Sequence, residues 1–121
     1  MGADQGANPV EYTLAALNGC LTTSLIYHAA AQRVERDEVE SILSGDLDIQ
    51  GFLGMSETIR NGYESIEATF KIKSDAPREK IKELVEFAKN MSPVFDIISH
   101  PRTEIKVLVA RLRSIALYFE R

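Results

Sequence analysis

The most constraining feature of the sequence is a run of 21 residues, Tyr12 to Gln32, without a single Asp, Glu, Lys or Arg. A helix with no charge on any face is normally buried on most of its sides. A membrane-spanning helix needs about 20 predominantly apolar residues, yet seven residues of this run are polar. They are Thr13, Asn18, Thr22, Thr23, Ser24, His28 and Gln32. We therefore expect a long helix buried at the centre of a soluble fold.

The start of this helix is marked by the sequence Asn8-Pro9-Val10-Glu11. Asn8 can cap the first backbone N–H groups, proline fits the first helical position, and Glu11 has the spacing of a capping box. The helix is predicted to run to about Arg33. Its apolar side comprises Leu14, Leu17, Leu21, Leu25 and Ile26.

Two strands are predicted after the helix. Residues alternate between apolar and polar from Val39 to Ile49, although Ile42 interrupts the pattern. Gly51 to Gly62 is predicted to be a connecting loop. The clearest strand is Tyr63 to Lys73, with Glu67, Thr69, Lys71 and Lys73 outward. Its predicted inward residues are Ile66, Ala68, Phe70 and Ile72.

The second half of the chain predicts two more helices and a strand. Ser74-Asp75-Ala76-Pro77 opens a helix whose apolar residues recur at helical spacing. Ser92-Pro93 starts a short helix through about Ile98, which Pro101 ends. Thr103 to Ala110 alternates as a strand, and residues 111–121 fit either a strand or a helix. The order predicts an α+β fold with the sheet backing the hydrophobic helix.

Composition narrows the class of protein. The 121 residues predict one domain, residues 1–121, and a net charge of −4 without a basic cluster argues against nucleic-acid binding. One cysteine excludes an internal disulfide and a cysteine-rich zinc site, and His28 and His100 do not make a metal site. We expect no cofactor, no secretory signal and a cytoplasmic location.

Three residues are candidates for chemistry. Cys20 is the only plausible nucleophile, although a free cysteine in mid-helix is more often an inert small apolar residue. Glu11 can act as a general base, but the capping box explains it as well. A nucleophilic role for Ser92 lacks an identifiable histidine–carboxylate partner, and N-capping explains this residue without chemistry.

The segment Asn8-Pro9-Val10-Glu11-Tyr12-Thr13-Leu14-Ala15-Ala16-Leu17-Asn18-Gly19-Cys20 resembles the segment of OsmC/Ohr proteins that ends in their reactive cysteine. This family contains osmotically inducible and organic hydroperoxide resistance proteins. Three further segments fit in order, so the resemblance spans residues 8 to about 110. They are Gly45-Asp46-Leu47-Asp48 with Gly51-Phe52, Ser74-Asp75-Ala76-Pro77, and Ser92-Pro93-Val94-Phe95-Asp96.

The resemblance implies a fold, a partner and a chemistry. Two chains intertwine into a homodimer, with the cysteine-bearing helix buried against the second copy and packed on an antiparallel sheet. Cys20 matches the cysteine that attacks a peroxide and becomes a sulfenic acid. In the family a second cysteine resolves this acid as a disulfide, and an external dithiol restores the pair. A glutamate and an arginine orient the site.

The sequence departs from the family pattern at three points. Ser92 stands where the resolving cysteine is expected. The family glutamate falls on Val10, and Glu11 lies one residue away, about 100° around a helix. The amino-terminal β-hairpin that carries the arginine is expected to be missing, because Met1 lies only seven residues before Asn8.

Two functions follow as hypotheses. The first is a one-cysteine thiol peroxidase, peroxiredoxin-like in chemistry and active in oxidative stress, whose sulfenic acid is resolved by an outside thiol. The second is a non-enzymatic dimer that binds a small apolar ligand in the dimer cleft. The retained Cys20 favours the peroxidase. The departures at the resolving cysteine, the glutamate and the arginine favour the ligand-binding dimer.

Overall fold

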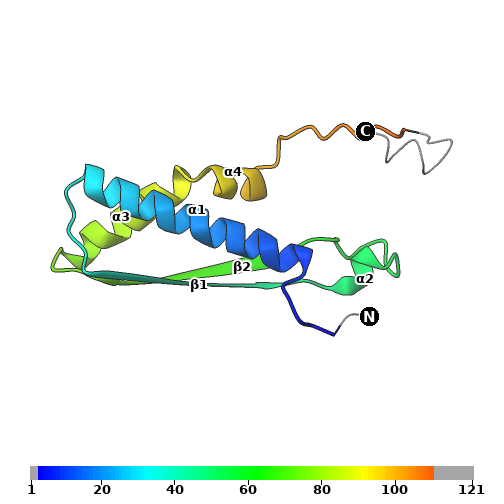
Figure 1. Cartoon of the computed structure of the whole chain (residues 1–121), viewed down its shortest axis with the longest axis horizontal. Helices are drawn as coiled ribbons and strands as arrows, with labels where there is room; N and C mark the ends of the chain where they lie inside the picture. Colours follow the sequence, from blue (N-terminus) through cyan, green and yellow to red (C-terminus); the bar gives the residue numbers. More distant parts are fainter. Residues whose placement is uncertain (1–2, 111–121) are drawn as a thin grey trace, which may run out of the picture.

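The computed structural model describes residues 3–110, and they form two layers. A two-stranded antiparallel sheet makes one layer, and the helices α1, α3 and α4 lie on one side of it (Figure 1). The elements in chain order are α1 (Pro9–Ala31), β1 (Glu38–Asp46), α2 (Ile49–Phe52), β2 (Ser65–Lys73), α3 (Arg78–Asn90) and α4 (Pro93–Ser99). The predicted α+β class is confirmed, with the Cys20 helix α1 packed on the sheet.

The predicted start of α1 is confirmed. The side chain of Asn8 accepts a hydrogen bond from the backbone N–H of Glu11 at 2.9 Å, and its amide nitrogen donates to the Glu11 carboxylate at 2.7 Å. Pro9 occupies the first turn, where its missing N–H costs nothing. The helix ends at Ala31, two residues before the predicted end. Arg33, with a φ of 57°, turns the chain back toward the sheet.

The sheet follows the predicted alternation over most of its length. In β1, alternate residues from Val39 to Gly45 are half-buried, and in β2 the half-buried residues are Ile66, Phe70 and Ile72. Strand β1 ends at Asp46, so the predicted extension to Ile49 is wrong. The cause is Asp48, whose carboxylate accepts from the N–H of Gln50 and caps the short helix α2, which begins before the predicted loop and ends within it.

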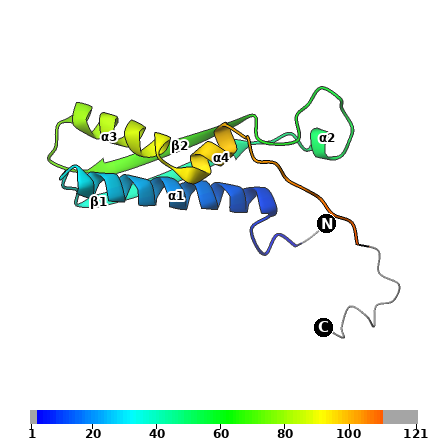
Figure 2. The ribbon, with the colours of Figure 1, turned by 90° about the horizontal axis from the view of Figure 1, so that it is seen from above.

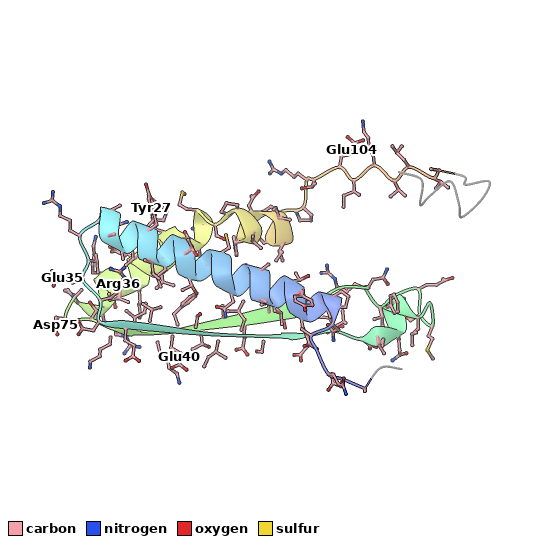
Figure 3. All side chains as sticks on the ribbon, viewed as in Figure 1. Tyr27, Glu35, Arg36, Glu40, Asp75 and Glu104 are labelled. Carbon is pink, nitrogen blue, oxygen red and sulfur yellow. The ribbon has the colours of Figure 1, made fainter. Side chains whose placement is uncertain are left out.

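The outer face of the sheet is polar, whereas the inner face carries the core. Glu40 in β1 points away from the helices (Figure 3). One cluster of the buried core joins α1 and the turn after it to α3; its residues are Leu25, Ala29, Val34, Leu84 and Ala88. Ala68 on β2 lies on the inner face with Phe70 and Ile72, as predicted, but it is exposed because it lines an open groove between β2 and α3.

The helices α3 and α4 form as predicted, but only α4 begins with a side-chain cap. Pro77 precedes α3 without a side-chain cap, and the Ser74 hydroxyl instead bonds the backbone at Ala76 and Glu35. Ser92 caps α4 by accepting from the N–H of Phe95 at 3.2 Å, and the helix extends one residue beyond the predicted end.

The predicted strand from Thr103 to Ala110 is wrong for the single chain. Residues 101–110 have no regular structure and lead away from the sheet (Figures 1 and 2). A strand exists only by pairing with a neighbour, and this segment has none within the described chain. The apolar side chains of Ile105, Val107 and Val109 are therefore exposed. The tail that fits strand or helix, 111–121, lies outside the described residues.

Candidate functional site

The fold brings Cys20 and Ser92 into direct contact, although 72 residues separate them in the sequence. Cys20 lies in the middle of α1 and is half-buried. The Ser92 hydroxyl donates a hydrogen bond to its sulfur, with an Oγ–Sγ distance of 3.0 Å. Ser92 is only 1% exposed, so this contact is shielded from water on the serine side.

The turn between α3 and α4 is held against α1, which fixes the position of Ser92. The hydroxyl of Ser24, one helical turn beyond Cys20, donates to the carbonyl of Ala88 at 2.6 Å. The backbone N–H of Ser92 donates to the carbonyl of Lys89 at 3.1 Å. The hydroxyl of Ser92 also accepts from Phe95, so the residue is tied to α3, α4 and α1 at once.

Cys20 opens onto a shallow hollow of about 510 Å³ between α1 and the α3–α4 turn. Its lining is mainly apolar and contains no Asp, Glu, Lys or Arg. The lining residues are Gly19, Cys20, Thr23, Ser24, Tyr27, His28, Met91 and Pro93. His28 packs edge-on against Tyr27 and Phe87, with ring centroids 5.0 and 4.9 Å away. A hollow with a mainly apolar lining fits an organic molecule better than a small polar one.

Glu11 is not brought to Cys20. Nine residues separate the two on one straight helix, which places them about 13 Å apart along its axis. The Glu11 carboxylate is engaged with Asn8 at the helix start. At the Val10 position, the backbone carbonyl accepts a hydrogen bond from the Tyr63 hydroxyl at 2.7 Å. Burial raises the pKa of Tyr63 above its usual value, and the nearby Glu11 carboxylate adds to this increase.

A model of the OsmC-like protein family matches residues 2–107, which is most of the chain. The chain belongs to the OsmC-like family. Among the solved structures, an OsmC-like protein from Mycoplasma pneumoniae has a TM-score of 0.70 at 18% identity and matches 80% of this chain. A hypothetical protein from Aquifex aeolicus VF5 has a TM-score of 0.64 at 19% identity, over 85% of this chain and 72% of its own.

The 121-residue chain spans 65% of the length of the OsmC-like protein from Mycoplasma pneumoniae. At 18–19% identity, the two structures establish the fold alone. The predicted resemblance is therefore confirmed at the level of family and fold. No curated protein matches the sequence.

Within residues 3–110 of the OsmC-like chain, no group of three His, Cys, Asp or Glu side chains is arranged to hold a metal ion. His100 instead bonds the hydroxyl of Ser99 at 2.9 Å. None of the described helices combines the length and hydrophobicity that a membrane crossing requires.

Sequence reasoning missed a polar cluster on the sheet side of α1. Ser41 in β1 donates to the amide oxygen of Asn18, and its hydroxyl lies 2.9 Å from that of Thr22. Asn18 and Thr22 are one helical turn apart and share a face. The signal was present, since Ser41 is a polar residue at an inward position of β1. The cluster satisfies its own hydrogen bonds and fixes α1 on the sheet.

Proposed function

We propose that this protein is a one-cysteine thiol peroxidase that reduces organic hydroperoxides. The Cys20 thiolate attacks the terminal peroxide oxygen, the O–O bond breaks, and the alcohol leaves after taking up a proton. The sulfur is oxidised by two electrons to a sulfenic acid. An external thiol then attacks this sulfur and releases water, and a second thiol reduces the mixed disulfide.

The observation that carries the proposal is the contact between Cys20 and Ser92 beside the apolar hollow. The sulfur is accessible from the hollow, whose lining suits the organic part of a hydroperoxide. The family resemblance puts Ser92 at the position of the resolving cysteine; the contact with Cys20 supports this, and a hydroxyl cannot form the disulfide. The reductant must therefore come from outside the chain.

The test is peroxide consumption with dithiothreitol as the reductant. We expect Cys20-dependent turnover of cumene hydroperoxide, faster than that of hydrogen peroxide because the hollow is apolar. The Cys20→Ser variant changes only the reacting atom and serves as the control. Turnover no higher than that of Cys20→Ser would rule out the peroxidase.

The alternative is a non-enzymatic protein that binds a small apolar ligand. It is favoured by the open groove between β2 and α3, where Phe70, Ile72 and Ile81 lie in the lining. Mass spectrometry after mild peroxide treatment separates the two functions. Selective oxidation of Cys20 supports the peroxidase, and an unreactive Cys20 supports ligand binding.

We also propose that the protein is a homodimer in which a second copy covers the outer side of α1. This side carries no charged residue, and Tyr12 and Tyr27 are 64% and 67% exposed on it. A contiguous exposed apolar patch is typical of an interaction site. Its exposed residues recur at intervals of four and three, the spacing of helix-to-helix packing. They are Tyr12, Ala16, Gly19, Thr23, Ile26 and Ala30.

A single arginine at the centre of this outer side should prevent dimerisation. In Thr23→Arg, the two copies would bury unpaired charges, so we expect a monomer in multi-angle light scattering. Thr69→Arg is the matched control, because Thr69 lies exposed on the polar outer face of β2. We expect Thr69→Arg to remain a dimer. A dimeric Thr23→Arg variant would refute this interface.

A further inference from the structure

We infer that Ser92 is a positioning residue for Cys20, which orients the sulfur and stabilises its thiolate form through the hydroxyl hydrogen bond. This inference deepens the proposed function and rests on it, because the contact affects chemistry only if Cys20 reacts as a thiolate. It assigns a role to the serine that replaces the resolving thiol.

A serine hydroxyl can make a limited number of hydrogen bonds. It has one proton to donate and two lone pairs to accept with. In this structure the proton is directed at Sγ of Cys20, and one lone pair accepts from the N–H of Phe95. The helix cap thus fixes the oxygen and leaves the proton for the sulfur. The two bonds run in series, so each polarises the other.

Among the described residues, the hollow around Cys20 has no Asp, Glu, Lys or Arg in its lining. On α1, the titratable groups that line the hollow are Tyr27 and His28. On α3, the ammonium group of Lys89 is 2.7 Å from Glu86 and lies over the ring of Phe95. On α4, Asp96 is exposed. The Ser92 hydroxyl is thus the hydrogen-bond donor that the described residues direct at the sulfur.

The experiment compares Ser92→Gly with the unchanged protein by the pH dependence of Cys20 alkylation with iodoacetamide. Glycine is nearly as good an N-cap as serine, so α4 is retained while the hydroxyl is lost. A donated hydrogen bond favours the thiolate, so its loss should move the half-maximal alkylation rate to higher pH. At neutral pH we expect the rate to fall about fivefold.

Two controls separate this role from a structural one. Ser92→Thr keeps the hydroxyl and should restore the alkylation profile of the unchanged protein. Thermal unfolding by circular dichroism shows whether each variant is folded. A folded Ser92→Gly protein with an unchanged pH profile would overturn the inference. Alkylation needs no peroxide, so a shifted profile without peroxide turnover would refute the proposed function and leave the role of Ser92 intact.

Discussion

Ser92→Cys is expected to convert the contact with Cys20 into an intramolecular disulfide. The Ser92 oxygen lies 3.0 Å from the Cys20 sulfur, and a sulfur on the same Cβ extends further because the C–S bond is longer. Closing a loop of about 72 residues restricts the unfolded chain and should stabilise the oxidised protein by about 4 kcal/mol. The variant should also consume cumene hydroperoxide with a disulfide intermediate that the unchanged protein lacks.

The disulfide is measured by free-thiol titration and by a mass decrease of two hydrogens after oxidation. Ser99→Cys is the matched control, because it makes the same change at the exposed end of α4. The Ser99→Cys protein should keep both thiols, with no disulfide formed within one chain. If Ser92→Cys kept both thiols after mild oxidation, the geometry of the Cys20 site described above would be wrong.

Leu25→Ala is expected to lower the free energy of unfolding by about 3 kcal/mol, a large part of the stability of a small domain. Leu25 is 2% exposed and lies where α1 meets α3, in contact with the core around Leu84 and Ala88. The substitution removes buried methyl groups and leaves a cavity that the rigid helices cannot close. Urea unfolding followed by circular dichroism measures the difference.

Leu53→Ala is the matched control for the core prediction. It removes the same atoms from a residue that is 55% exposed, just after α2. We expect a loss below about 1 kcal/mol, because little apolar surface leaves water at this position during folding. Equal losses in the two variants would contradict the core as described.

The local features of the fold could be predicted from the sequence because their signals are local. The cap at Asn8, the cap at Ser92 and the alternation in β2 each depend on residues within one or two turns. The end of β1 was missed because the apolar–polar alternation continues to Ile49, whereas the Asp48 side chain already caps the next helix, α2. Boundaries between elements depend on such small differences.

The features that the sequence could not predict depend on distant parts of the chain. Ala68 has the alternation of an inward residue, but only the position of α3 decides that it lines an open groove. The strand expected after Thr103 needs a partner edge, which periodicity cannot supply. Cys20 and Ser92 were both predicted as site residues, but their hydrogen bond became visible only in the fold. Their catalytic roles stay predictions.

The packing of α1 on α3 has a consequence for the order of folding. Leu25 and Leu84 belong to the same core, but 59 residues separate them. At about 5–20 residues per second of synthesis, the ribosome releases α1 several seconds before α3 can cover it. During that interval the apolar residues of α1 that later pack on α3 stay exposed to water. Native burial of α1 must wait for the second half of the chain.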